Sequence, residues 1–411
     1  ISGLINSTEK DLYTNQSLTV GFSNHTLKGQ LKGSITFING KQELDETRST
    51  FSDDPDYFTD SSQQLTHLSY HFKPKNNLKT VISGRLSHLE RYYSNTSDET
   101  NTQTTNATYN SDVNSLEIVN NLSMNNEQSL IFGSDFIKES GKSSGDFFGS
   151  IDTPVETQTS IGIFSQYRWI NSVLSTQLGS RIDYYSKDND KDNVTTYHLS
   201  LFRDIPYINT LIKGTVKSAF KLPSLYQRFN PTYGNDDLNV EFSKTKEISL
   251  SKTIGNAAIS TTYFETDITD KITWDDNDTP SIYTDDSYQN TAKDEFSGMD
   301  YDIELRDYNL LKFFRINYST FDSDNIKIPD YKLTTSLGIQ QNKWRYGFFI
   351  TSVGETKLPS YSYTDVSVHY DINNTLNVFF KAHNVFDKDY QTVSNFTEPG
   401  RTLFVGLKRF F

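Results

Sequence analysis

The chain ends with Thr-Leu-Phe-Val-Gly-Leu-Lys-Arg-Phe-Phe at residues 402–411, preceded by Ala-His-Asn-Val-Phe-Asp-Lys-Asp-Tyr at residues 382–390. The pattern predicts a strand, a loop and a last strand that finishes on the aromatic residues Phe410 and Phe411. Outer-membrane β-barrels finish in this way, and in a closed barrel the final strand must meet the first so that its backbone groups are paired. We therefore expect Phe410 and Phe411 to serve barrel closure and assembly.

The composition supports a barrel over other classes. Only 34% of the 411 residues are hydrophobic, yet 14% are aromatic, whereas disordered chains are poor in aromatic residues. A large transmembrane barrel explains both values, because each strand turns one face to lipid and the other to water. No run approaches the eighteen or so apolar residues of a membrane-spanning helix. The chain contains no Cys, and its net charge of -13 argues against a nucleic-acid partner.

Alternation with a period of two residues recurs along the chain. In residues 366–370 the apolar Val366, Val368 and Tyr370 share one face, and Ser367 and His369 lie on the other. This period is that of a strand with two different environments.

The connections alternate between short and long. Short turns are predicted at residues 73–77, 124–127, 170–171, 206–209, 255–256, 309–312, 341–343 and 373–375, and long polar loops at residues 39–62, 94–112, 141–156, 186–194, 222–242, 276–294, 325–331, 355–361 and 389–399. Short periplasmic turns with long extracellular loops are typical of outer-membrane barrels. We count about nineteen strands and, because single-chain bacterial barrels have an even number, we expect about 20–22 antiparallel strands, with the uncounted one near residues 16–38. The fold class is thus all-β.

Catalytic motifs are missing from the sequence: it has no HExxH, no GxSxG and no phosphate-binding Gly-rich loop. We therefore expect no enzyme and no organic cofactor.

Acidic residues gather in the long loops. Asp53, Asp54 and Asp56 stand in one loop, and Asp188 and Asp190 in another. Carboxylates on flexible loops suit Ca²⁺, so these five are candidate calcium ligands. Charge that merely solubilises the loops is the alternative.

Several segments resemble the barrel of TonB-dependent outer-membrane transporters, most closely the cobalamin (vitamin B12) receptor group. They are residues 220–225, 233–238, 267–272, 296–300 and 384–390. The nearest match is the last, with Asn384, Phe386, Asp387 and Tyr390, followed by Pro-Gly-Arg at residues 399–401. Residues 1–6 resemble the last strand of the family's plug domain, so we expect residues 1–8 to be the plug–barrel junction and residues 9–411 the barrel.

The resemblance implies a function. It suggests a receptor in the bacterial outer membrane that actively takes up a scarce large ligand, either a corrinoid or a ferric siderophore. The energy would come from the TonB complex, acting through the family's plug domain, which we expect to be missing from this chain. Other expected partners are the lipid bilayer with its lipopolysaccharide and the small-molecule ligand, and the protein would be a monomer. Tyr226, Phe229 and Tyr233 are candidate ligand contacts. A passive porin and a structural or adhesive barrel are the alternatives.

Overall fold

The computed structural model describes residues 3–4, 12–26, 28–44, 54, 56–96, 104–146, 150–187, 190–275, 286–325 and 327–409. Phe410, Phe411, Asp53 and Asp188 lie outside the described residues, as does the side chain of Asp190. Within these ranges no helix is long and apolar enough to cross a membrane.

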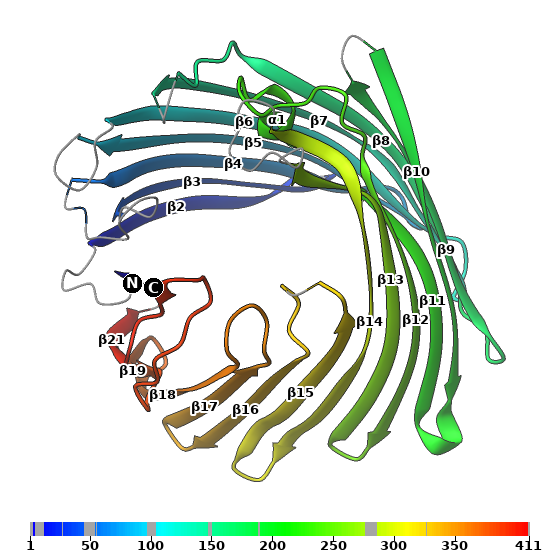
Figure 1. Cartoon of the computed structure of the whole chain (residues 1–411). Helices are drawn as coiled ribbons and strands as arrows, with labels where there is room; N and C mark the ends of the chain where they lie inside the picture. Colours follow the sequence, from blue (N-terminus) through cyan, green and yellow to red (C-terminus); the bar gives the residue numbers. More distant parts are fainter. Residues whose placement is uncertain are drawn as a thin grey trace.

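One antiparallel sheet forms a barrel (Figure 1). Its nineteen described strands are β2 (Tyr13–Thr26), β3 (Gly29–Glu43), β4 (Phe58–Lys75), β5 (Leu78–Asn95), β6 (Thr105–Ser123), β7 (Gln128–Asp146), β8 (Glu156–Trp169), β9 (Ser175–Lys187), β10 (Asp190–Ile205), β11 (Thr210–Lys221), β12 (Glu241–Ile254), β13 (Ala257–Asp275), β14 (Ser287–Tyr308), β15 (Leu311–Ser323), β16 (Tyr331–Gln341), β17 (Trp344–Val353), β18 (Tyr361–Asn373), β19 (Leu376–His383) and β21 (Thr402–Arg409). Four short elements complete the description: β1 (Gly3–Leu4), which pairs with β20 (Phe396–Thr397), the turn η1 (Pro206–Ile208) and the helix α1 (Leu225–Phe229). The all-β antiparallel barrel is confirmed, although the described strands number fewer than the 20–22 expected.

The predicted alternation of short turns and long loops is confirmed, with several corrections to the bounds. The predicted loops at residues 94–112 and 276–294 are too long, because β6 already begins at Thr105 and β14 at Ser287. Residues 16–38 include parts of two paired strands, β2 and β3, whose ends Thr26 and Gly29 lie on the rim of short turns. The predicted loop at residues 186–194 is wrong for most of its length, because β9 and β10 continue pairing out to Lys187 and Asp190. Local polarity suggested a loop there, whereas cross-strand backbone bonds extend the sheet.

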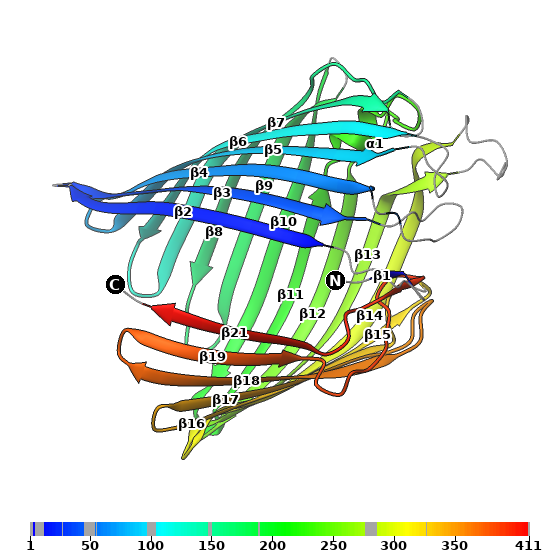
Figure 2. The same cartoon turned by 90° about the vertical axis from the view of Figure 1, so that its left-hand side faces the viewer.

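Residue pairs join each strand to the next from β2–β3 to β18–β19, and then join β19 to β21. β2 and β21, which are neighbours in the closed barrel, lie on either side of one seam (Figure 2). Both strands run toward the short-turn rim: Thr26 ends β2 opposite Gly29, and Arg409 ends β21 opposite Leu376. The two strands at the seam are therefore parallel to each other.

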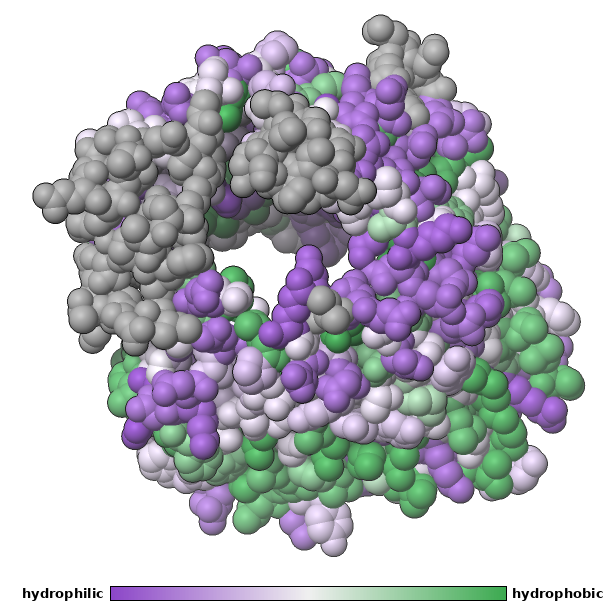
Figure 3. All heavy atoms as spheres, in the orientation of Figure 1, coloured by the Kyte–Doolittle hydropathy of each residue, from purple (hydrophilic) through white to green (hydrophobic). Residues whose placement is uncertain are grey.

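The two faces of the strands have opposite character. On β10, Leu199 and Leu201 are 38% and 42% exposed on the outer wall, while Ser200 between them is fully buried on the inner side. Hydrophobic residues gather on the outer wall and hydrophilic ones around the opening (Figure 3). This is the pattern that a lipid-facing wall around a polar lumen requires.

A charged bridge joins β7 and β9 across β8 on the lumen side. The Arg181 guanidinium on β9 contacts Asp135 on β7 at 2.6 Å and Asp183 on its own strand at 2.5 Å. Gly162 on β8 makes room for it, since a Cβ atom there would lie 2.0 Å from Arg181 Nη2.

We predict that Gly162→Ala weakens the barrel, because the added methyl must displace a guanidinium that two carboxylates hold in place. The free energy of unfolding should fall by about 1–3 kcal/mol, as for other overpacked sites. Gly214→Ala is the matched control, since a Cβ there meets nothing within 4 Å. Urea titration in lipid vesicles, followed by tryptophan fluorescence, measures both. Equal midpoints for the two variants would contradict the role given to Gly162.

Candidate functional site

A short helix stands at the mouth of the barrel, on the side of the long loops (Figure 1). Pro223 and Ser224 precede α1, and Ser224 caps it: its hydroxyl accepts from Gln227 N at 3.2 Å, and Gln227 Oε1 accepts from Ser224 N at 3.0 Å. This reciprocal capping box fixes the first turn. A helix of five residues is too short to be stable alone, so tertiary contacts must hold it.

Arg228 supplies the main contact on one side. It is only 5% exposed, and its guanidinium donates to Asp236 Oδ1 at 2.5 Å. It also donates to Gln158 Oε1 on β8 and to the Ser186 carbonyl on β9, each at 3.4 Å. The side chain thus fastens α1 to the barrel wall and to the loop that follows α1.

Two further contacts position the segment of residues 222–240, which we call the mouth segment. Gly141 on β7 lets Leu225 approach the wall, since a Cβ there would lie 3.1 Å from Leu225 Cδ1. At the other end, Tyr288 N donates to the Tyr233 carbonyl at 3.2 Å, and Asn235 Nδ2 donates to the Tyr288 carbonyl at 2.8 Å. The mouth segment therefore reaches from β7, β8 and β9 to the start of β14.

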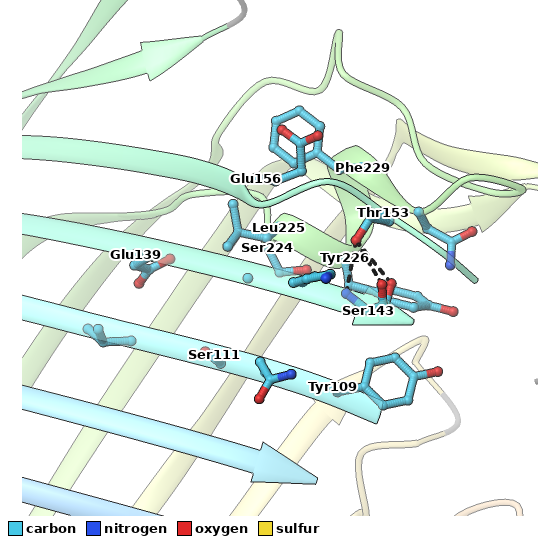
Figure 4. Close-up of a pocket in the computed structure, with 15 residues that line it drawn as sticks. Tyr109, Ser111, Glu139, Ser143, Thr153, Glu156, Ser224, Leu225, Tyr226 and Phe229 are labelled. Carbon is cyan, nitrogen blue, oxygen red and sulfur yellow. Dashed lines mark hydrogen bonds between the residues drawn. The ribbon is translucent and has the colours of Figure 1, made fainter. Parts of the chain in front are cut away.

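Between α1 and the wall lies a cavity of about 350 Å³, the outer cavity (Figure 4). Its walls come from β6, β7, the start of β8 and α1, with side chains that include Tyr109, Ser111, Glu139, Lys142, Ser143, Glu156, Tyr226, Phe229 and Asn230. A second space of about 380 Å³, the inner cavity, lies farther along the lumen wall and includes Gln158, Ser160, Arg181 and Asp183. Glu139 and Ser224 line both, so the two cavities are adjacent.

Aromatic rings extend from the outer cavity across the mouth. Tyr226 lies 6.3 Å from Tyr288, Tyr288 lies 5.4 Å from Trp274, and Trp274 lies 4.6 Å from Tyr233, measured between ring centroids. We call these four residues the aromatic arc. Burial, with Tyr288 close by, raises the pKa of the Tyr226 phenol, so it remains a hydrogen-bond donor at neutral pH.

The structure brings together two of the three predicted contact residues. Tyr226 and Phe229 both line the outer cavity, whereas Tyr233 packs against Trp274 in the aromatic arc. That they touch a ligand stays a prediction. Sequence reasoning did not single out Tyr109 and Tyr288, which fell in predicted long loops. The structure places them on β6 and β14, and only tertiary structure brings them to the outer cavity and to Tyr226.

A separate group of buried oxygens lies at the same rim. Asp54 is 3% exposed and Asn95 is 1% exposed, and Asn95 Nδ2 donates to Asp54 Oδ2 at 2.8 Å. Asp54 Oδ1, Asp56 Oδ1, Thr59 Oγ1 and Asn95 Oδ1 are buried without a hydrogen-bond donor. We call these four residues the acidic loop cluster. Burial raises the pKa of Asp54 to about 6; the bond from Asn95 opposes this shift and the nearby Asp56 adds to it.

The acidic loop cluster holds only two carboxylates. Over the part of the chain that the structure describes, no group of three or more His, Cys, Asp or Glu side chains could hold a metal ion. A cation at the acidic loop cluster would therefore also need the amide and hydroxyl oxygens of Asn95 and Thr59. The side chains of the other predicted pair, Asp188 and Asp190, lie outside the described residues.

The closing motif has a structural role. Asn384 is fully buried with a positive φ of 49°, and its side chain bonds the backbone of Lys388 in both directions, at 2.8 and 3.0 Å. Asp387 accepts from Arg401 N at 2.6 Å. Tyr390 stacks on Tyr361 at 4.7 Å, while Phe386 is 68% exposed. The motif shapes the last long loop and returns the chain to the barrel wall.

Comparison with known proteins gives one family. Residues 4–385 match the model described as TonB dependent receptor-like, beta-barrel. A vitamin B12 transporter, BtuB, of Vibrio cholerae is 22% identical over 242 residues, which are 54% of this chain and 38% of that protein. The BtuB of Photobacterium profundum is 21% identical over 239 residues. The chain therefore spans well under half the length of these curated relatives.

Solved structures share the fold. The siderophore receptor PirA from Acinetobacter baumannii superposes with a TM-score of 0.78 at 15% identity, covering 98% of this chain and 71% of that one. A mutant of the ferric enterobactin receptor PfeA from Pseudomonas aeruginosa, in complex with enterobactin, gives a TM-score of 0.80 at 16% identity, covering 99% and 71%.

We predict that Arg228→Ala loosens the mouth segment, because it removes the buried donor to Gln158, Ser186 and Asp236. Loss of hydrogen bonds to a charged group costs about 1.5–3 kcal/mol, so chymotrypsin should cut after Tyr226 or Phe229 roughly ten- to a hundredfold faster. The exposed Arg203, near the opposite rim, provides the control variant Arg203→Ala. If the mouth segment of Arg228→Ala were cut at the wild-type rate, the anchoring role would be wrong.

Proposed function

Because the chain belongs to the family of TonB-dependent receptor-like β-barrels, whose members lie in the bacterial outer membrane, we propose that it serves the active uptake of a scarce ligand too large for a porin. The ligand would be a corrinoid or a ferric siderophore, and the energy would come from TonB. It is a transport receptor rather than an enzyme.

The observation that carries the proposal is the outer cavity beside the aromatic arc. Ligand sites are concave, with apolar and aromatic walls and a few polar groups that fix orientation. Tyr226, Phe229 and Tyr109 supply rings, and Asn110 and Ser111 supply neutral hydrogen-bonding groups. The outer cavity opens at the long-loop rim, where an extracellular ligand would arrive, and the inner cavity continues into the lumen.

The relatives support both ligand classes. BtuB is named as a vitamin B12 transporter, and PirA and PfeA as siderophore receptors. Large ligands of both kinds need a wide barrel and a binding surface at its mouth. We assign that surface here to the outer cavity.

Uptake by intact cells tests the proposal. A strain that lacks the native protein would receive the complete gene, and labelled cyanocobalamin and ferric siderophores would be supplied at nanomolar concentration. Uptake of one ligand that stops when TonB is removed is the expected result. Passage of small solutes without TonB, and no accumulation of either ligand, would favour the porin alternative.

We predict that Tyr226→Ala and Phe229→Ala each weaken ligand binding to outer-membrane vesicles, because each removes a large ring from the outer cavity. An aromatic residue at the centre of a binding surface contributes about 2 kcal/mol or more, so affinity should fall roughly thirtyfold. The control is Tyr207→Ala, since Tyr207 is 86% exposed on the short-turn rim. Unchanged affinity in both cavity variants would contradict the site.

We further propose that the acidic loop cluster binds Ca²⁺. Its fit rests on the four buried oxygens that have no donor, because a hard cation satisfies such oxygens and Ca²⁺ accepts carboxylate, amide and hydroxyl ligands together. Asp54 and Asp56 would supply the charge, and Asn95 and Thr59 the neutral oxygens. Backbone carbonyls and water complete such sites in general.

We predict that calcium binding weakens in acid. Because the pKa of Asp54 is about 6 without the ion, protons compete for this carboxylate below that pH, and affinity near pH 5 should be about tenfold lower than near pH 7.5. The pH dependence of folding stability without calcium has the opposite sign. Because the Asp54 carboxyl has a higher pKa in the folded protein than in the unfolded chain, the folded state favours its protonated form, and the free energy of unfolding falls as the pH rises through about 6.

Isothermal titration with calcium chloride measures this dependence. Asp54→Asn and Asn95→Ala should abolish the binding, while Asp152→Asn, in the loop after β7, should keep it. Wild-type protein that takes up no calcium at either pH would overturn the assignment.

A further inference from the structure

The protein itself engages both Arg181, which lines the inner cavity, and Arg228, which lies on α1. Arg181 contacts Asp135 and Asp183, and Arg228 contacts Asp236 and Gln158. Planar guanidinium groups are the usual partners of anionic ligands, because their donors match carboxylate and phosphate oxygens in pairs. Here both groups already hold carboxylates at 2.6 Å or less, so neither offers its charge to a ligand.

The remaining charges are mostly negative. Glu139 and Glu156 line the outer cavity, and among the residues that the structure describes neither has an ion-pair partner. Lys142 is the one lysine among the lining residues that are described there. An anionic ligand in the outer cavity would therefore meet two carboxylates, Glu139 and Glu156, and only one ammonium group, that of the solvent-exposed Lys142.

The rest of the surface suits an uncharged molecule. Asn110 and Ser111 in the outer cavity offer neutral hydrogen-bonding groups, whereas the Ser143, Thr153 and Ser224 hydroxyls are bonded within the protein. Tyr226 lines the outer cavity with an aromatic ring, whose face carries partial negative charge and favours apolar or cationic groups. The Phe229 ring already has the Arg228 guanidinium 4.7 Å from its centroid.

We propose that the two cavities select by charge: they accept an uncharged or cationic ligand with flat apolar faces and neutral hydrogen-bonding groups, and they exclude polyanions. The inference rests on the proposed uptake function and narrows its substrate class. On this proposal the binding affinity depends on the charge of the ligand and not on whether it contains iron.

Two iron chelates of different charge separate these effects. A ferric trihydroxamate is uncharged, whereas ferric enterobactin is a polyanionic tris-catecholate, and cyanocobalamin provides a second uncharged probe. Binding to outer-membrane vesicles that carry the complete protein would be measured at low and at high salt. At least one uncharged probe should bind about tenfold or more tightly than ferric enterobactin at low salt, and added salt should narrow the gap by screening the repulsion.

Carboxylate variants test the cause. In Glu139→Gln/Glu156→Gln the affinity ratio of ferric enterobactin to the uncharged probe should rise by about tenfold, because two repulsive charges are removed. Glu127→Gln, at the short-turn rim, is the control and should leave the ratio at its wild-type value. A ratio that is equal in both variants would overturn the charge mechanism.

The outcomes distinguish this inference from the function it rests on. Tighter binding of ferric enterobactin than of both uncharged probes overturns the charge selection and leaves the uptake function standing. Failure of all three ligands to bind the wild-type protein, with no TonB-dependent uptake, overturns both.

Discussion

The structure depends on one constraint of the bilayer: a backbone N–H or C=O group in hydrocarbon must find its partner within the protein. The ladder from β2 to β21 meets this need strand by strand. Once backbone pairing fixes the wall, side chains follow with a period of two, so Leu199 faces out and Ser200 faces in. The lumen can then carry charge, as Arg181 and its two aspartates show, since its environment is water and protein rather than lipid.

Much of the fold could be predicted from local patterns. Alternation and turn residues are encoded within a few positions, and they located almost every turn and long loop. Most of residues 186–194, like parts of the predicted loops at 94–112 and 276–294, belong instead to strands. There polar residues continue β9 and β10, whose stability comes from pairing with each other. Amino-acid composition reports only local polarity, whereas the length of a β-hairpin depends on backbone pairing between its two strands.

The candidate site was less accessible to prediction. Tyr226 and Phe229 belong to a recognisable segment, but the Tyr109 and Tyr288 rings beside them come from β6 and β14. Asp54 and Asp56 are visible as loop acids, while Thr59 and Asn95 look ordinary until burial leaves their oxygens without donors. Arg228 gave no sequence signal at all. Its role arises because β8, β9 and the mouth segment meet around one guanidinium.

The shared direction of β2 and β21 has a consequence for symmetry. Strands that alternate in direction around a ring return to their starting sense only when their number is even, and the described ladder has an odd number. The junction between β2 and β21 therefore cannot have the antiparallel geometry of the eighteen other strand–strand junctions. Direct contact there would demand slanted, evenly spaced parallel bonds, which are slightly weaker per residue than the antiparallel pattern elsewhere. An antiparallel seam would instead require an odd number of further strands. In either case one junction in the ring differs from all the others. An otherwise repetitive barrel wall therefore has one position from which its strands can be told apart.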